Sequence, residues 1–334
     1  MKKLVYLLVL IVLITSCKKN DYVTFSGKVT NKTSDSLIVY NQQKAYRKVI
    51  QLDKEGVFKD TLKVENGFFG LSDGKKATNV YFKNGDEIIL NIDANDFIKS
   101  SIFSGKGAAE SNFLSKSIVA QQELIGDRVA LFNLPKEEFD TKIKTYVDNF
   151  KSGLKNKVLD TSFVKLQEQS IQSLQDYVNK MHGEQLYIKT KLAKGMPSPK
   201  FSAYENYDGN ETSLDDLKGK YVYIDVWATW CKPCKNEIPF LKKIEKKYHD
   251  KNIEFVSISI DKQEDYFEWR EMIEEKELGG TQLYAKEDKA FVQGYKINGI
   301  PRFILIDPTG NIVDSDAPRP SDTKLEELLS SLEI

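Results

Sequence analysis

Two cysteines separated by two residues are the side chains of this sequence best suited to chemistry. They lie in the stretch Trp230-Cys231-Lys232-Pro233-Cys234, between an apolar run and a helical pattern. At a helix N-terminus, unpaired N–H groups and the helix dipole favour a thiolate, and Lys232 adds a positive charge nearby. Because the thiolate is the nucleophile of disulfide exchange, we expect Cys231 to attack a substrate disulfide and Cys234 to resolve the mixed disulfide.

Four other uses of this cysteine pair remain open at this point. A zinc site needs four ligands, and the whole sequence has only three Cys and two His. Covalent haem attachment needs a His directly after the second cysteine, where Lys235 stands. A peroxidatic cysteine of the peroxiredoxin type has a Thr three residues before it, where this chain has Ala228. The fourth use, a structural disulfide, is disfavoured by the flanking tryptophans and by the strand–helix junction.

The elements that position the cysteines are predicted from hydrophobic periodicity. The near-continuous apolar run 221–227 is typical of a buried strand, and two more strands are predicted at 253–260 and 303–306. Helical patterns cover residues 237–248, 265–276 and 321–332, and Ser321 is the candidate N-cap of the last helix. This alternation predicts an α/β domain at residues 196–334, with a partly parallel sheet covered by helices.

The stretch Asp225-Val226-Trp227-Ala228-Thr229-Trp230-Cys231-Lys232-Pro233-Cys234 resembles the thioredoxin active-site signature. More narrowly, it resembles that of the membrane-tethered TlpA/ResA/CcmG group of envelope thiol-disulfide oxidoreductases. Pro239 matches the proline of the first long thioredoxin helix, and Ile300-Pro301 matches the family's cis-proline loop; a trans loop proline is the alternative. The resemblance covers roughly residues 196–334. It implies a thioredoxin-like fold, dithiol–disulfide exchange, no metal or organic cofactor, and a substrate groove at Trp230, Ile300 and Pro301.

Two carboxylates are candidate catalytic groups beside the cysteines. Asp225 lies inside the apolar strand, where thioredoxins have a buried Asp and the TlpA-like group more often has Asn. Because burial raises the pKa of a carboxyl group, we expect Asp225 to take the proton of Cys234 through a water. The resemblance to ResA gives Glu237, three residues after Cys234, an influence on the proton chemistry of the dithiol. The alternatives are an Asp225 bonded to the backbone and an ordinary solvated Glu237.

The N-terminus is predicted to be a targeting signal. A short basic head precedes eleven apolar residues, Leu4 to Ile14, and a helix of that length spans about 16 Å, roughly half of a bilayer core. This pattern indicates a secretory signal. Ser16 before Cys17 resembles the bacterial lipobox, so we expect residues 1–16 to be a lipoprotein signal peptide and Cys17 to be lipidated. A plain signal peptide and an uncleaved anchor are the alternatives.

Two further segments separate this signal from the thioredoxin-like region. Residues 17–104 alternate apolar and polar side chains between turn sequences such as Asn66-Gly67 and Asn84-Gly85, which predicts a small antiparallel β domain. Residues 105–195 have apolar residues at helical spacing and predict a helical segment. Both resemble extensions found ahead of lipoprotein thioredoxins, which assigns them no activity.

Composition and resemblance together bound the function. The 334 residues suggest about two domains, and 49 basic against 49 acidic residues give no electrostatic reason to expect nucleic-acid binding. We expect a lipid-anchored oxidoreductase facing the periplasm that reduces disulfides of secreted or cytochrome-maturation proteins. Its electron donor is expected to be a membrane thiol transporter of the DsbD/CcdA type. A dithiol oxidase or isomerase, and a non-catalytic binding lipoprotein, are the alternatives.

Overall fold

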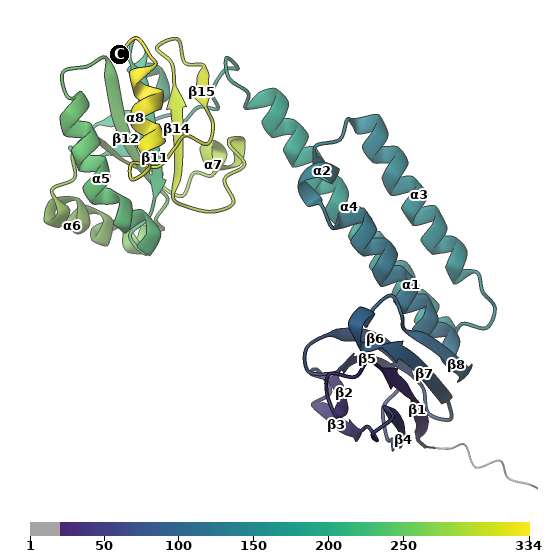
Figure 1. Cartoon of the computed structure of the whole chain (residues 1–334). Helices are drawn as coiled ribbons and strands as arrows, with labels where there is room; N and C mark the ends of the chain where they lie inside the picture. The colour runs from purple at the N-terminus through teal and green to yellow at the C-terminus, as the bar shows by residue number, and fades with distance from the viewer. Residues whose placement is uncertain (1–20) are drawn as a thin grey trace, which may run out of the picture. The chain divides into compact units, whose positions relative to one another are not determined.

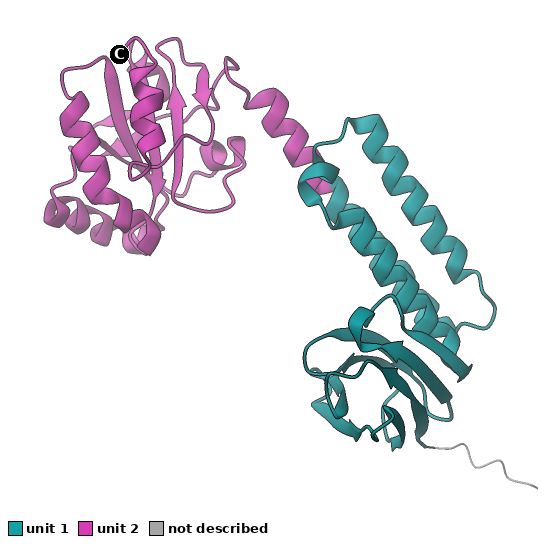
Figure 2. Ribbon diagram, in the orientation of Figure 1, with its two compact units in different colours: residues 1–179 teal, residues 180–334 magenta. Residues whose placement is uncertain are grey.

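The structure is a computed structural model that describes residues 21–334, so the expected signal peptide and Cys17 lie outside the described residues. The chain divides into two compact units, residues 1–179 and 180–334, with the boundary inside helix α4 (Thr161–Lys191; Figures 1 and 2). Each unit has its own hydrophobic core. Within residues 21–334, no helix combines the length and the apolar character needed to cross a bilayer.

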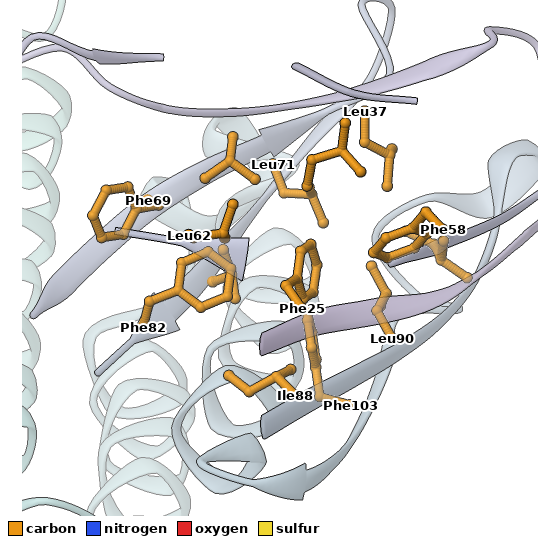
Figure 3. Packing of buried hydrophobic residues seen from close by; sticks show 14 of the residues in the cluster. Phe25, Leu37, Phe58, Leu62, Phe69, Leu71, Phe82, Ile88, Leu90 and Phe103 are labelled. Carbon is orange, nitrogen blue, oxygen red and sulfur yellow. The ribbon is translucent and has the colours of Figure 1, made fainter. Parts of the chain in front are cut away.

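The N-terminal unit begins with eight strands in two four-stranded sheets, ordered β4-β1-β7-β8 and β3-β2-β5-β6. Aromatic side chains from both sheets meet in one core: Phe25 of β1 packs on Phe82 of β6, which also contacts Phe69 of β5 (Figure 3). The expected antiparallel β domain is confirmed, although β1 and β7 pair in parallel. The elements are β1 (Val23–Thr30), β2 (Ser36–Asn41), β3 (Tyr46–Gln51), β4 (Val57–Leu62), β5 (Gly67–Ser72), β6 (Ala77–Phe82), β7 (Glu87–Asp93), η1 (Ala94–Asp96) and β8 (Ile102–Lys106).

The helical segment follows directly and is also confirmed. Its helices are α1 (Ala108–Ile125), α2 (Arg128–Phe132), α3 (Lys136–Leu154) and α4. Phe163 at the start of α4 is fully buried and packs edge-to-face against Tyr81 of β6. Leu114 of α1 and Leu154 of α3 complete the same cluster. The first helices therefore pack on the β6 side of the sheets and form one unit with them.

The C-terminal unit has a seven-stranded sheet in the order β10-β9-β13-β12-β11-β14-β15. The three strands β11, β12 and β13 are parallel, and β14 pairs antiparallel with β11. The strands are β9 (Tyr204–Asn206), β10 (Glu211–Thr212), β11 (Tyr221–Trp227), β12 (Ile253–Ser259), β13 (Thr281–Tyr284), β14 (Arg302–Ile306) and β15 (Ile312–Asp314). The helices are η2 (Leu214–Leu217), α5 (Lys232–Tyr248), η3 (Gln263–Asp265), α6 (Tyr266–Lys276), α7 (Ala290–Gly294) and α8 (Thr323–Ser330). The expected partly parallel sheet covered by helices is confirmed.

Strand β11 sets which side chains meet the cysteines. Its residues alternate between the two faces of the sheet: Val222, Ile224 and Val226 join the core that contains α7. Tyr223 joins the opposite core, which contains α5 and α8 (Figure 1). Asp225 therefore faces α5. Because α5 begins only five residues after β11 ends, its first turn lies over this face and brings Cys234 toward Asp225.

Candidate active site

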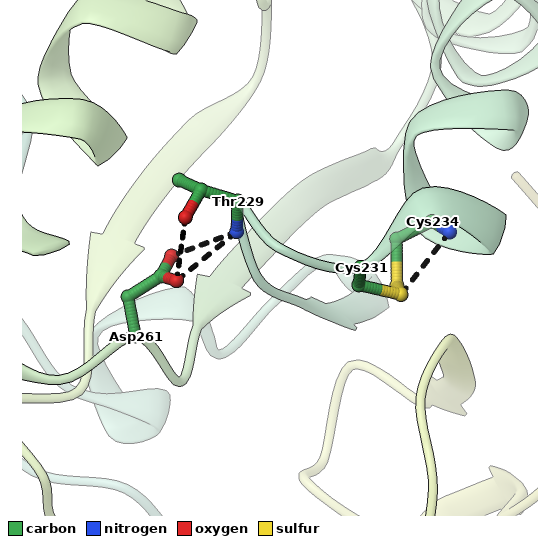
Figure 4. Close-up of a disulfide and its surroundings, with 4 residues drawn as sticks. All are labelled: Thr229, Cys231, Cys234 and Asp261. Atoms are coloured by element: carbon green, nitrogen blue, oxygen red, sulfur yellow. Dashed lines mark hydrogen bonds between the residues drawn. A yellow bond between two sulfur atoms is a disulfide. The ribbon is translucent and has the colours of Figure 1, made fainter.

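Cys231 and Cys234 form a disulfide at the start of α5 (Figure 4), with Cα atoms 5.3 Å apart. Cys231 is the N-cap residue, and its Sγ accepts a hydrogen bond from the Cys234 backbone N–H at 3.2 Å. Pro233 costs no helical hydrogen bond in this first turn, where N–H groups have no intrahelical partner. On reduction, the Cys231 sulfur is left facing the helix N-terminus, which stabilises a thiolate.

A buried carboxylate fixes the loop that leads to Cys231 (Figure 4). Asp261, directly beyond β12, is fully buried and accepts hydrogen bonds from the Thr229 N–H at 3.0 Å and the Thr229 hydroxyl at 2.9 Å. The Ser259 hydroxyl donates a third bond at 2.7 Å. Asp261 thereby joins the ends of β11 and β12. Asp261 was not among the predicted site residues, although an acidic residue directly after a predicted parallel strand was a usable signal.

The three residues of the expected substrate groove are exposed or half-buried. Trp230 is 61% exposed next to Cys231. The Ile300–Pro301 peptide bond is cis, as the resemblance implies, and Ile300 packs on the cluster that contains both cysteines. Arg302, directly after the cis proline, forms an ion pair with Asp316 at 2.5 Å. Binding of substrate by this groove stays a prediction.

Asp225 is 6% exposed, and its Oδ1 makes no hydrogen bond within residues 21–334. Burial, together with the nearby carboxylates of Glu237 and Glu245, raises the pKa of Asp225 to about 8. Asp225 and Cys234 both line a cavity of about 10 Å³, close to the smallest space that holds one water. The structure thus gives the buried carboxyl and the thiol a shared polar space.

Glu237 is not the solvated helix residue that the sequence analysis left open as an alternative. It is 8% exposed and accepts hydrogen bonds from the Ser321 N–H and the Ser321 hydroxyl, both at 3.0 Å. The prediction of Ser321 as the N-cap of the last helix is wrong, because this hydroxyl is used by Glu237. Asp322 caps α8 instead and accepts from the Lys324 N–H. Glu237 acts on the site through its charge, which raises the pKa of Asp225.

Glu245 is a third carboxylate at the site and was not among the predicted site residues. It lies two turns beyond Glu237 on α5 and lines the same cavity as Asp225 and Cys234. Burial raises its pKa to about 7, opposed by the positive charge of Lys242. The available signal was its helical spacing, since residues 237, 241 and 245 share one face of α5.

The family model described as Redoxin matches residues 193–330. The thiol-disulfide oxidoreductase ResA of a Bacillus cereus strain is 28% identical over 144 residues, which are 43% of this chain and 81% of the relative. The thioredoxin domain of a thiol-disulfide oxidoreductase from Bacteroides vulgatus is 32% identical; the match covers 42% of this chain and 99% of that structure, with a TM-score of 0.38. The C-terminal unit is thus a redoxin domain with a thioredoxin-like fold. Within that class, this domain is similar to the TlpA/ResA-like thiol-disulfide oxidoreductases.

Proposed function

We propose that this protein reduces disulfide bonds of other proteins in the cell envelope through the Cys231–Cys234 dithiol. The observation that carries the proposal is the cysteine pair at the N-terminus of α5, with the buried Asp225 behind it. A helix N-terminus favours the attacking thiolate, and a buried carboxyl with a raised pKa suits proton transfer near neutral pH. Similarity to ResA supports the same reaction class.

The reaction proceeds in two exchange steps. The Cys231 thiolate attacks one sulfur of the substrate disulfide, which forms a mixed disulfide and releases the other substrate sulfur as a thiolate. Cys234 then attacks the Cys231 sulfur, so that the enzyme disulfide forms and the second substrate thiolate leaves. The enzyme dithiol is oxidised and the substrate disulfide is reduced by the same two electrons. The proton of Cys234 passes to Asp225 through a water in the cavity that both residues line.

The surroundings of the reaction follow from the rest of the sequence. Lipidation of Cys17 would anchor the protein, and the exchange domain would face the periplasm. Its substrates would be secreted proteins or proteins of cytochrome maturation that carry cysteine pairs. Because each turnover leaves the Cys231–Cys234 disulfide, a membrane thiol transporter of the DsbD/CcdA type would return the electrons.

The reduction potential of the Cys231–Cys234 pair tests the direction of exchange. The chain from Lys18 onward, which lacks Cys17, is equilibrated in glutathione or dithiothreitol buffers, and free thiols are trapped and counted by mass. A potential near that of thioredoxin, about −270 mV, supports the reductase. A potential near about −120 mV would replace it with an oxidase. The Cys234→Ser control cannot form the intramolecular disulfide. If the wild-type protein also failed to form it in every buffer, disulfide exchange would be refuted.

A further inference from the structure

The cavity behind the dithiol is lined by parts of α5, of the strands β11, β12 and β13, and of the segment after α6. Asp225 and Trp227 of β11, Gln282 of β13, and Cys234 and Glu245 of α5 all line it. Its volume of about 10 Å³ fits a single water, provided that polar groups are present to hold it.

Three of these side chains have a buried polar atom without a partner among the described residues: Asp225 Oδ1, Trp227 Nε1 and Gln282 Oε1. The Gln282 amide is fixed by its own N–H, which donates to the Gly279 carbonyl at 2.6 Å and leaves Oε1 as an acceptor. One donor and two acceptors match the capacity of a water, which accepts from the indole and donates to the two oxygens. Buried polar atoms of this kind are normally paired, so the cavity has the chemistry of a built water site.

Glu245 connects this cavity to the surface. Its carboxylate lies against two successive glycines. A Cβ atom added to Gly279 would lie 2.8 Å from Glu245 Oε2, and a Cβ atom added to Gly280 would lie 3.2 Å from Glu245 Oε1. The Gly-Gly pair therefore leaves the space that the carboxylate occupies. The side chain is only partly buried, so one residue contacts both the cavity and solvent.

The charged neighbours of Glu245 come from its own helix and from the end of α6. Lys242 is on α5, and its ammonium donates to the Lys276 carbonyl at 2.8 Å and pairs with Glu277 at 3.7 Å. The lining residues from β12 and β13 are the uncharged Ser257 and Gln282. The Asp225 carboxyl is thus the other carboxyl group that lines the cavity, and the Glu245 carboxylate raises the pKa of Asp225.

We propose that Glu245 is the exit group for the proton that Asp225 receives, with a water held by Asp225, Trp227 and Gln282 as the bridge. The inference rests on the proposed function, because the proton is the one that Cys234 releases. In a molecule whose Asp225 is ionised, the Cys234 thiol gives its proton through this water to the Asp225 carboxylate as its sulfur attacks Cys231. The protonated Asp225 carboxyl then donates to the water, which frees one water hydrogen to donate to the Glu245 carboxylate. A proton moves along this path to Glu245, which releases it to bulk solvent. Glu245 acts through Asp225 and does not touch the reacting sulfurs.

Glu245→Gln in the chain from Lys18 onward tests this path, with Glu277→Gln as a matched control that removes a neighbouring charge outside the cavity lining. The reduced protein, in excess, is mixed with 5,5′-dithiobis(2-nitrobenzoate), which releases one coloured thiolate when Cys231 attacks and another when Cys234 resolves the mixed disulfide. In dilute buffer near neutral pH, we expect the second release to slow about tenfold in Glu245→Gln, with the first release unchanged. Added imidazole, a small proton carrier, should restore the rate.

The results of this assay distinguish proton transfer from Asp225 through the water to Glu245, here called the relay, from other effects of the substitutions. Equal second-release rates in the wild type, Glu245→Gln and Glu277→Gln would overturn the relay, and so would a slow rate that imidazole leaves unchanged. Gly279→Ala, which displaces the Glu245 carboxylate but keeps its charge, should reproduce the imidazole-dependent defect. A wild-type protein that never releases the second thiolate would refute the proposed function itself.

Discussion

Replacing Asp225 with Asn should make the C-terminal unit more stable, and the gain should grow with pH. The pKa of Asp225 is raised from 3.8 to about 8 in the folded protein, first by burial and then by Glu237 and Glu245. Between these two values, the folded state keeps a proton that the unfolded state has lost. The free energy of unfolding therefore falls as pH rises through this window. The Asn side chain does not ionise, so the variant lacks this loss.

The expected size follows from the two pKa values. One pKa unit corresponds to about 1.4 kcal/mol, so the Asp225 contribution changes by about 2.5 kcal/mol between about pH 5 and about pH 7. Above the folded-state pKa of about 8, the unfolding free energies of wild type and variant should again run parallel. The pKa of Glu245 is raised to about 7, so Glu245 also makes the free energy of unfolding fall with rising pH, in the wild type and in the variant alike. The difference in unfolding free energy between the two proteins therefore reports Asp225.

Urea unfolding of the oxidised proteins, followed by tryptophan fluorescence, measures this difference. All three tryptophans of the chain, Trp227, Trp230 and Trp269, belong to the unit 180–334, so the signal reports that unit alone. Asp250→Asn removes a carboxylate whose side chain is 97% exposed, and this control should follow the wild type at every pH. A stability difference between Asp225→Asn and wild type that stays constant from about pH 5 to about pH 7 would contradict a buried protonated carboxyl.

Three further changes test other parts of the site. Asp261→Ala leaves the Thr229 N–H without its buried acceptor and should lower the free energy of unfolding by about 3 kcal/mol, against about 1 kcal/mol for Thr229→Val; the same urea assay compares them. Ser321→Ala removes one of the two hydrogen bonds to Glu237 and should cost about 1 kcal/mol in thermal unfolding. Trp230→Ala, at an exposed position, should change the free energy of unfolding by less than about 1 kcal/mol. It should also raise KM for a protein disulfide but not for a small one.

The parts of the site that the sequence predicted are local in the chain. The cysteine pair, the strand before it and the helix after it lie within residues 221–248, where periodicity and motif spacing agree with the structure. The cis Ile300–Pro301 bond came from the resemblance alone, because nothing in the residues themselves selects the cis form. An antiparallel β domain in the N-terminal unit was predicted from turn sequences, but the parallel pairing of β1 with β7 joins strands far apart in the chain.

The parts that the sequence did not predict depend on contacts between distant residues. Gln282 is on β13, a four-residue strand whose Thr-Gln start carries no strong hydrophobic pattern. Its place in the Asp225 cavity follows only from the parallel pairing of β11, β12 and β13. The Ser321–Glu237 bond joins residues 84 positions apart, so local capping rules selected the wrong N-cap. Glu245 fitted a general pattern of charged residues on α5, and only the Gly279–Gly280 backbone explains why it reaches inward.

Two buried aspartates, one on β11 and one just beyond the end of β12, show how the fold separates structural from reactive carboxylates. Asp261 receives three donor groups, the Thr229 N–H, the Thr229 hydroxyl and the Ser259 hydroxyl, so its oxygens are satisfied and it holds the loop in place. Asp225 lies at a similar depth, but its Oδ1 has no donor among residues 21–334. A carboxyl in that environment keeps its proton and lowers stability at neutral pH, a cost that folded proteins retain mainly at functional sites. The contrast argues that Asp225 is present for proton transfer, since an Asn of almost the same shape would fill the position with less loss of stability.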